Sequence, residues 1–420
     1  MNKTIFLRKL NHNKQRLITT VKWVVFSVIT GCVVGLIATA FSFCLNLVTE
    51  LRLAHPAFLL LLPVGALGIV ALYRGILKEK DPGTNLILSA IHSGDDIPLR
   101  MAPLISVATV FTHLCGGSAG REGAALQLGG SLGSSLGSLF HFQKNDRHVM
   151  IMCGMSAAFS ALFGTPLAAA VFSMEVVSVG IMHYAALLPC AISALIARSI
   201  ASAFHLEESA YVIDALPAFS LLPAVKICAL AALCGLLSIA FCVILHQSQH
   251  LFQKVFPNPW IRALAGGSAV LLLTILVGNQ DYNGAGTAMI AASVEGSVPW
   301  EAFLIKMLFT AITLAAGYKG GEIVPTLFVG ASFGCLFGNL IGFSPALCAA
   351  AGMGALFCGV TNAPLSSLLI CIELFGAEAM PYFLLSIAFS YMVSGYYGLY
   401  SSQKIVYSKY KSDFINKQAQ

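Results

Sequence analysis

Long apolar segments without charged residues restrict what this chain can fold into. They occupy residues 23–48, 57–73, 227–245 and 382–393. A helix that crosses the hydrocarbon core of a bilayer needs about 20 such residues. Only 10% of the chain is charged, whereas about a quarter of the residues of a soluble domain are. The sequence therefore predicts an all-α polytopic membrane protein, in which the shorter, glycine-broken stretches 123–139 and 323–333 are tilted or partial spans.

Positive charge is concentrated at the two ends of the chain. The basic residues before residue 23 and after residue 403 are Lys3, Arg8, Lys9, Lys14, Arg16, Lys22, Lys404, Lys409, Lys411 and Lys417. Lys and Arg flanks stay on the cytoplasmic side of a membrane, so both termini are expected to be cytoplasmic in a multi-pass protein of the cell membrane. The net charge of +6 then reflects topology, and no nucleic-acid partner is predicted.

These features divide the chain into three expected regions. Residues 1–22 form a basic cytoplasmic N-terminus, 23–405 a transmembrane domain and 406–420 a cytoplasmic tail with no regulatory domain. The first apolar run is longer than the core of a signal peptide and lacks a clear cleavage site. The twelve cysteines are scattered singly and the ten histidines show no metal-ligand spacing. Neither a disulfide framework nor a cofactor is expected.

The chain contains a weak internal repeat. Gly154-Met155-Ser156-Ala157, Pro166 and Glu175 are matched 198 residues later by Gly352-Met353-Gly354-Ala355, Pro364 and Glu373. An earlier block, Gly120-Arg121-Glu122, is matched 201 residues later by Gly321-Glu322-Ile323. The two halves run from about 80 to 205 and from about 280 to 400. Duplicated halves with glycine- and proline-interrupted segments indicate a transporter whose site lies where the repeats meet.

Each half carries a glutamate and a cation within a glycine-rich break that precedes an apolar helix. The first break is Gly116-Gly117-Ser118-Ala119-Gly120-Arg121-Glu122-Gly123-Ala124, and the second is Gly317-Tyr318-Lys319-Gly320-Gly321-Glu322-Ile323-Val324-Pro325. Charges inside spanning segments usually face a cavity and mark a pathway. Free N–H groups at a helix N-terminus favour a bound anion. The breaks predict an anion site beside a carboxylate, although an Arg121–Glu122 pair that only seals a helix break remains an alternative.

These motifs resemble those of the CLC family of chloride channels and anion–proton antiporters. Gly120-Arg121-Glu122-Gly123 resembles the family signature, and the segment 320–325 resembles its Gly-x-Phe-x-Pro motif. Leu399-Tyr400-Ser401 resembles the segment with the pore tyrosine, and Gly83-Thr84-Asn85 occupies the place of the family's serine loop. The resemblance covers residues from about 20 to 405. It implies two pseudo-symmetric, inverted helical repeats whose broken helices meet at a central anion site, and a homodimer in the lipid bilayer.

The resemblance also implies roles for individual residues. Glu122 corresponds to the gating glutamate that couples anions to protons, and Glu207 roughly matches the internal proton-transfer glutamate, although a solvated helix-end carboxylate explains it as well. The expected anion-binding residues are Thr84, Asn85, Gly120, Arg121, Gly123, Gly321, Glu322, Ile323 and Tyr400. The implied partners are a halide anion and protons, and the protein is not expected to be an enzyme.

Three departures from the family pattern resemble its fluoride-exporting branch. The family serine is replaced by Thr84 with Asn85 beside it, the signature proline is Ala124, and Glu322 stands where chloride transporters usually have an aliphatic residue. A small, tightly hydrated fluoride needs close hydrogen-bond donors, which a protonated Glu322 or the Asn85 amide can supply. A fluoride/proton antiporter is therefore favoured. A chloride/proton antiporter or a chloride channel remains open because Thr84 keeps a hydroxyl group.

Other features receive structural interpretations. Gly-x-Ser-x-Gly occurs at 116–120, 129–133 and 330–334, which makes an intramembrane serine hydrolase a distant alternative, although a nucleophile elbow needs a strand before the serine. Glu175 and Glu373 are expected to anchor the interface between the repeats. Lys306 and Arg198 are expected to extend their charged ends to the membrane surface.

Overall fold

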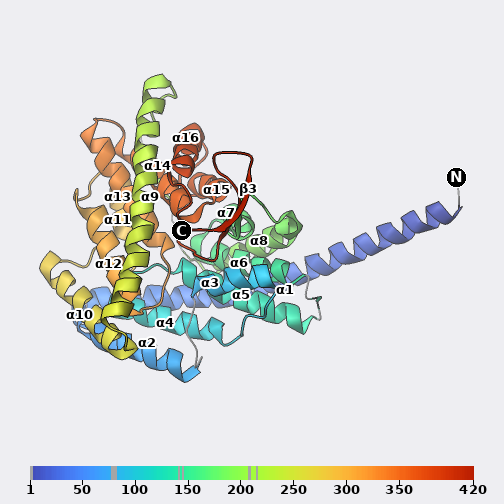
Figure 1. The fold of residues 1–420 in the computed structure, drawn as a ribbon, viewed down its shortest axis with the longest axis horizontal. Coiled ribbons are helices and arrows are strands. Elements are labelled where there is room, and N and C mark those ends of the chain that lie inside the picture. The colour runs from blue at the N-terminus through green and yellow to red at the C-terminus, as the bar shows by residue number, and fades with distance from the viewer. Residues whose placement is uncertain (1–2, 77–82, 141, 144–145, 207–209, 214–215) are drawn as a thin grey trace.

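A computed structural model describes the chain except residues 1–2, 77–82, 141, 144–145, 207–209 and 214–215. The described part is predominantly helical, as Figure 1 shows. The α-helices of the first half are α1 (Lys3–Ala54), α2 (Leu62–Ile76), α3 (Thr84–Ser93), α4 (Met101–Cys115), α5 (Glu122–Leu139), α6 (Arg147–Phe163), α7 (Pro166–Glu175) and α8 (Leu187–Ala203). Those of the second half are α9 (Leu221–Val255), α10 (Pro259–Val277), α11 (Thr287–Val294), α12 (Ala302–Ala316), α13 (Ile323–Leu340), α14 (Pro345–Thr361), α15 (Pro364–Phe375) and α16 (Met380–Val393).

The predicted repeat extends over almost the whole described chain. Helices α4, α5 and α6 have 15, 18 and 17 residues, and α12, α13 and α14 have the same three lengths in the same order. In each half a long helix, α1 or α9, precedes them, and a short proline-initiated helix, α7 or α15, follows. The repeat is therefore larger than the segments 80–205 and 280–400 that the motifs mark. Figure 1 shows that the two halves are interleaved, since α2 of the first half (blue) lies beside α10 of the second half (yellow).

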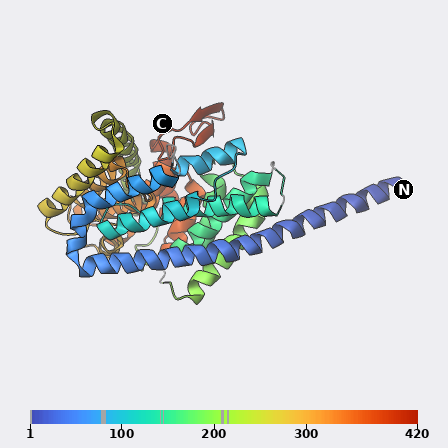
Figure 2. The same ribbon diagram turned by 90° about the horizontal axis from the view of Figure 1, so that it is seen from below.

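Helix length and composition agree with the predicted membrane protein. Among the described residues, six helical segments are long and apolar enough to cross a bilayer. Seven shorter apolar helices of 10–17 residues, such as α6 and α14, join them. Figure 2 shows α1 running along one edge of the molecule, with its N-terminal part extending away from the other helices. Large apolar side chains such as Leu47, Leu272 and Ile275 are exposed on these helices, as expected for surfaces that face lipid.

Glycine stripes allow the two helical hairpins at the centre to pack closely. A Cβ atom at Gly129 of α5 would lie 2.2 Å from the Gly154 carbonyl oxygen of α6. The equivalent atom at Gly330 of α13 would lie 2.6 Å from the Gly352 carbonyl oxygen of α14. Backbones in contact at this distance accept no side chain. Small residues at such crossings are the usual means of tight packing in membranes, and here the two halves use them at corresponding positions.

Glu175 and Glu373 join the two halves, because the carboxylate of each binds the N-terminus of a helix in the other half. The carboxylate of Glu373, in the last turns of α15, accepts hydrogen bonds of 2.9 Å from the N–H groups of Leu167 and Ala168 at the start of α7. The carboxylate of Glu175, at the end of α7, accepts bonds of 3.1 and 2.8 Å from the N–H groups of Leu365 and Ser366 at the start of α15. Each negative charge satisfies free donors at a positive helix end. The predicted anchoring role is confirmed.

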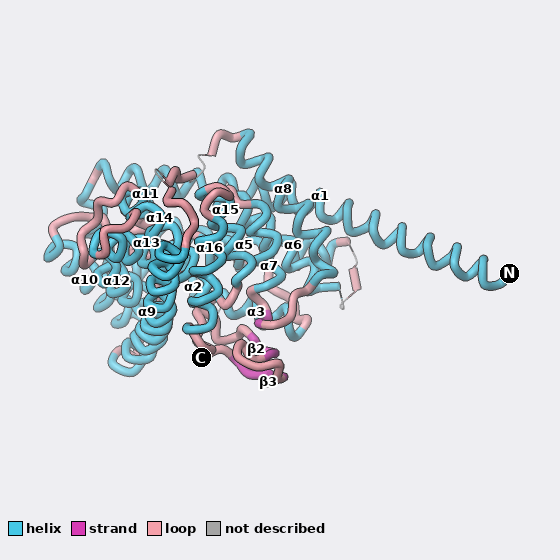
Figure 3. The backbone as a smooth tube through the Cα atoms, turned by 90° about the horizontal axis from the view of Figure 1, so that it is seen from above, coloured by secondary structure: helices cyan, strands magenta, loops and turns pink. Residues whose placement is uncertain are grey.

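The C-terminal segment forms a small sheet against the helical body. Strand β2 (Lys404–Tyr407) pairs in parallel with β1 (Ser178–Val179) and antiparallel with β3 (Phe414–Gln418). Figure 3 shows β2 and β3 as magenta strands at one edge of the molecule. Strand β2 crosses the boundary expected at residue 405, so the last residues of the expected transmembrane domain and the first residues of the tail share one strand.

Candidate functional site

The two glycine breaks meet at the centre of the molecule. Gly120 and Gly321 form an antiparallel bridge in which each N–H group donates to the carbonyl oxygen of the other residue at 2.7 Å. Helix α5 begins at Glu122 and α13 begins at Ile323, so both helices start next to this bridge. The mutual pair of bonds relates the two halves symmetrically and brings the predicted helix N-termini together.

Only glycine fits at this meeting point. A Cβ atom at Gly321 would lie 2.4 Å from the main-chain nitrogen of Gly123, and one at Gly123 would lie 2.9 Å from the Cα atom of Gly321. A Cβ atom at Gly120 would lie 2.6 Å from a carboxylate oxygen of Glu122. The glycines that the sequence marks as anion-binding are thus the residues that let the backbones and this carboxylate approach one another.

Glu122 turns its carboxylate back onto the start of the helices. Its Oε2 atom accepts a 2.9 Å hydrogen bond from the N–H group of Arg121. The main-chain N–H groups of Glu122 itself and of Val324, in the first turn of α13, also lie near the carboxylate. The side chain is only 1% exposed. A negative group therefore occupies the place where donors from both halves converge, which is where a small anion would bind.

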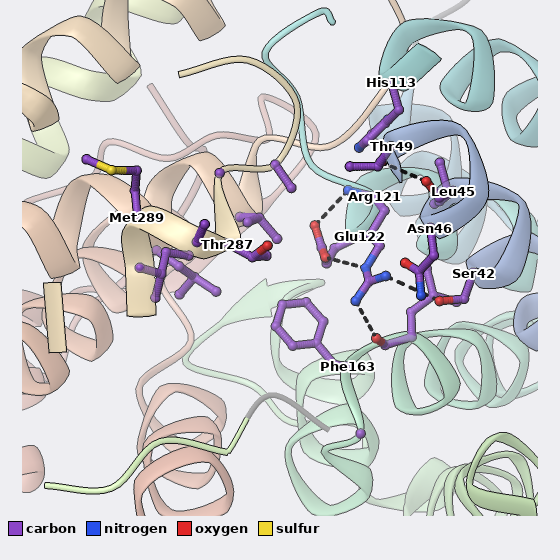
Figure 4. Close-up of a pocket in the computed structure, with 18 of the residues that line it drawn as sticks. Ser42, Leu45, Asn46, Thr49, His113, Arg121, Glu122, Phe163, Thr287 and Met289 are labelled. Atoms are coloured by element: carbon purple, nitrogen blue, oxygen red, sulfur yellow. Dashed lines mark hydrogen bonds and ion pairs between the residues drawn. The ribbon is translucent and has the colours of Figure 1, made fainter. Parts of the chain in front are cut away.

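Arg121 lies beside this carboxylate but is also fixed by other groups. Its Nε atom is 3.7 Å from Glu122 Oε1. Its two terminal nitrogens donate to the Ser42 hydroxyl and to the Leu162 carbonyl oxygen, each at 3.2 Å. Figure 4 shows these bonds. The ion pair that the alternative interpretation required is present, and it leaves the carboxylate bound to the helix N-termini.

Thr84, Glu322 and Tyr400 approach the meeting point as well. Thr84 is the first residue of α3, and Glu322 occupies the N-cap position of α13 without a capping hydrogen bond from its side chain. The Thr84 hydroxyl oxygen and Glu322 Oε2 lie 3.3 and 3.5 Å from the position of a Cβ atom on Gly123. The Tyr400 hydroxyl and Glu322 Oε2 are buried without a hydrogen-bond partner among the described atoms, and the Tyr400 hydroxyl is close enough to Glu322 and Glu122 to interact electrostatically. Unpaired buried polar groups of this kind indicate a place for a ligand or water.

Asn85 follows Thr84 in α3, and its side chain contacts the chain two residues after Tyr400. Its side-chain oxygen accepts a 3.0 Å hydrogen bond from the Ser402 N–H group. The asparagine thereby fixes the turn that follows Tyr400, a positioning contact that the sequence did not suggest. Ile323 is fully buried in the first turn of α13, as expected for a residue that offers its main chain. Glu207 lies outside the described residues.

A cavity of about 440 Å³ opens from Glu122. Figure 4 shows Glu122, Arg121 and His113 on one side of it and Thr287 and Met289 of α11 on the other. Its charged and titratable lining residues are Glu50, Arg52, His113, Arg121, Glu122, Arg198, Tyr211 and Asp281. Arg198 thus lines the cavity. The cavity provides a path to the carboxylate from one side of the protein.

Two cations near this cavity were not recognised from the sequence. Arg52, in the last turn of α1, is 3% exposed and donates to Gln280 Oε1 at 2.9 Å. Lys306 in α12 is fully buried and donates to the carbonyl oxygens of Tyr282 and Gly284 at 3.1 and 2.8 Å. The expectation that Lys306 reaches the membrane surface is therefore wrong, because its ammonium group holds the 282–284 turn inside the protein.

The serines of the three Gly-x-Ser-x-Gly motifs make contacts expected of packed helices. Ser332 lies within α13 and donates to the Phe328 carbonyl oxygen at 2.8 Å. Ser131 lies within α5 and donates to the Pro98 carbonyl oxygen at 2.8 Å. Ser118 shares a 3.1 Å bond with the Thr310 hydroxyl. None of these three serines follows a strand, as a nucleophile elbow requires.

Comparison with known proteins identifies the family. The family model described as voltage gated chloride channel matches residues 65–395. A "Chloride/fluoride channel protein" of Pseudomonas syringae is 34% identical over 397 residues, covering 93% of this chain and 88% of the relative. An "H(+)/Cl(-) exchange transporter ClcA" of Vibrio cholerae is 25% identical, covering 83% and 81%.

Solved structures share the fold. A crystal structure of a CLC-type fluoride/proton antiporter matches with a TM-score of 0.88 and 30% identity, over 91% of this chain and 98% of that one. A slow cyanobacterial Cl⁻/H⁺ antiporter matches with a TM-score of 0.75 and 21% identity, over 89% and 94%. The predicted fold of two pseudo-symmetric repeats with broken helices is confirmed, and the protein is a multi-pass membrane protein and not an enzyme. The chain belongs to the voltage-gated chloride channel (CLC) family.

Proposed function

We propose that this protein is a fluoride/proton antiporter that exports fluoride from the cell. The observation that carries the proposal is the Glu122 carboxylate, held at 2.9 Å by the Arg121 N–H group where the first turns of α5 and α13 converge. A carboxylate and a halide compete for one such set of donors, because two negative charges cannot share it cheaply. Protonation of Glu122, or entry of an anion, releases the side chain.

The surrounding residues suit a small anion. Thr84 and Tyr400 offer hydroxyl groups, and Glu322 offers a third O–H group when it is protonated. The main-chain N–H groups of Gly123 and Ile323 belong to the first turns of α5 and α13. Short, strong donors at several positions offset the loss of hydration of fluoride. The fluoride/proton antiporter structure and the chloride/fluoride relative support fluoride as the substrate.

The charge distribution supports an orientation in the membrane. Helix α1 carries Lys22 before its apolar span and Arg52 at its other end. A cytoplasmic basic N-terminus therefore places Arg52, and with it the Glu122 cavity, on the outer side of the cell membrane. The basic C-terminal sheet lies on the cytoplasmic side in this arrangement. Two copies of the chain form a homodimer in the bilayer, with one pathway in each copy.

Flux measurements with purified protein in liposomes test the proposal. Vesicles loaded with fluoride or chloride are diluted into halide-free buffer, and an ion-selective electrode and an internal pH dye record anions and protons. We expect faster release of fluoride than of chloride, with protons driven inward against their own gradient. Fluoride release without proton uptake would indicate a channel. The Glu122→Gln variant serves as the uncoupled control.

Chloride/proton antiport is the second candidate. Its support is the Thr84 hydroxyl, buried next to Gly123, at the position where the family carries its serine, and the Vibrio cholerae relative named for chloride exchange. Faster release of chloride than of fluoride in the same vesicles would favour it and would remove the fluoride assignment.

A further inference from the structure

Two residues that line the cavity leading to Glu122 each have a buried side-chain nitrogen without a hydrogen-bond partner among the described residues. Arg52 and His113 both line it and are each 3% exposed. Arg52 Nε and His113 Nε2 have no hydrogen-bond partner in the described part of the chain. Arg52 packs beside the end of α4, since its Cδ atom lies 3.4 Å from the position of a Cβ atom on Gly116. His113 is in the last turn of the same helix.

The guanidinium group of Arg52 is buried without a carboxylate partner. One terminal nitrogen of Arg52 donates to Gln280 Oε1. Arg52 takes part in no ion pair among the described residues. A buried cation of this kind is costly unless a negative charge compensates it. The acidic cavity residues Glu50 and Asp281 are exposed at the rim, and Glu122 is bound at the helix starts.

The hydrogen bonding of His113 sets what its free nitrogen can do. Nδ1 lies 2.9 Å from the Thr109 carbonyl oxygen, which can only accept, so Nδ1 carries a proton. In the neutral ring Nε2 then carries a lone pair and can only accept a hydrogen bond, and it becomes an N–H donor only when the ring is protonated. The charged groups that act on this ring are Arg52 of α1, Arg121 before α5 and Lys306 of α12. A fourth positive charge among these cations requires a negative charge nearby.

We propose that Arg52 and His113 form an outer anion site, distinct from the site at Glu122, that binds a halide together with a proton on His113. The anion accepts hydrogen bonds from Arg52 Nε–H and His113 Nε2–H, and its charge compensates both cations. Within the proposed function, on which this site rests for its substrate, the site receives fluoride after it passes Glu122. It also links release to the outer pH, because deprotonation of His113 removes one of the two donors.

Histidine-selective ¹⁵N NMR tests the site without relying on transport. The protonation midpoint of His113, assigned with His113→Gln, is measured in detergent with sodium fluoride and with sodium gluconate at equal ionic strength. We expect fluoride to raise the midpoint by about one pH unit, because the anion binds the protonated ring preferentially. Arg52→Gln should abolish this change, whereas Arg262→Gln on α10 should leave it intact. A midpoint that fluoride does not move in the wild type would overturn the proposal.

A flux measurement provides a second test if Arg52→Gln fails to fold. External fluoride at low pH should slow fluoride release, and His113→Gln should weaken this inhibition about tenfold, as expected for loss of a charge-assisted hydrogen bond. His250→Gln, on the exposed surface of α9, is the matched control. Equal inhibition in His113→Gln and wild type would overturn the site. A wild type that moves no fluoride but shows the NMR change would instead contradict the proposed function.

Discussion

Glu122 combines burial, charge and position in one side chain. Its carboxylate accepts a hydrogen bond from the Arg121 N–H group, lies near the Val324 N–H group of the other half and lines the cavity. The same group can therefore occupy an anion site, carry a proton and open a path. Arg121 contributes a neighbouring charge at 3.7 Å but is itself bound to Ser42 and Leu162, so it has little freedom to follow the carboxylate.

Replacing Glu122 with glutamine should separate anion movement from proton movement. The amide keeps the shape of the side chain but carries no titratable group, so fluoride should flow down its gradient without driving protons. The pH dye and the fluoride electrode in liposomes measure both. Glu50→Gln, an exposed carboxylate on the same cavity, should keep coupling. Proton-coupled flux that survives in Glu122→Gln would show that another residue carries the proton.

At the scale of elements, the contact between α5 and α13 depends on the absence of side chains. Gly321 and Gly123 bring their backbones so close that a Cβ atom on Gly321 would overlap the Gly123 nitrogen at 2.4 Å. The first N–H groups of the two helices face one place for that reason. The anion site is therefore formed by the positions at which α5 and α13 begin.

Gly321→Ala should push the two helix starts apart and reduce fluoride flux strongly. Overpacking of a close contact costs about 1–3 kcal/mol, and both neighbours here are backbone atoms that cannot rotate away. Thermal unfolding in detergent and liposome flux measure the two effects. Gly68→Ala in α2, where nothing lies within 4 Å of an added Cβ atom, should be neutral or stabilising by up to about 1 kcal/mol. Equal behaviour of the two variants would contradict the packing argument.

Glu175→Gln should destabilise the fold while leaving the chemistry of the site in place. The amide retains one acceptor but turns an N–H₂ donor toward a donor at the start of α15. A loss of about 1–3 kcal/mol is expected for an unsatisfied buried group, seen as a lower unfolding temperature. The exposed Glu378 provides a control, since Glu378→Gln should not change the temperature. An unfolding temperature that Glu175→Gln leaves unchanged would show that the bonds between this carboxylate and the start of α15 contribute little to stability.

The whole molecule is organised by its duplication. The Gly120–Gly321 bridge pairs a residue with its repeat equivalent. The glycine contact of α5 with α6 recurs between α13 and α14, and the contact of Glu373 with the start of α7 recurs between Glu175 and the start of α15. Two similar halves thus supply one site from opposite sides. The C-terminal strands β2 and β3 follow the last helix, and no second sheet occurs among the described residues.

The proposed orientation predicts which surfaces water-soluble reagents reach. Asp281→Cys, at the rim of the cavity, should react with a membrane-impermeant maleimide in intact cells, whereas Ser412→Cys in the exposed turn before β3 should react only after the membrane is opened. Most of the native cysteines are buried, and the unmodified protein measures their background. Labelling of both positions from the same side would contradict the orientation.

The sequence by itself determined the membrane environment, the duplication and the place of the glycine breaks. The length of the apolar segments and the scarcity of charged residues can be read directly from the chain. The constant offsets of 198 and 201 residues between the repeated motifs can also be recognised without knowing any contact. The family motifs added Glu122, Glu322 and Tyr400 because their neighbours in the chain are distinctive. The Glu175 and Glu373 anchors followed from their equivalent repeat positions.

Only the tertiary structure decided what those residues contact. That α5 and α13 meet through Gly120 and Gly321 depends on a pairing between residues 201 positions apart. The sequence does not show where the charged ends of Lys306 and Arg52 lie. A single cation in an apolar helix looks the same in the sequence whether it extends to the membrane surface or binds buried acceptors. The partners that decide between these outcomes, Tyr282, Gly284 and Gln280, lie on a distant turn that only the folded chain brings to them.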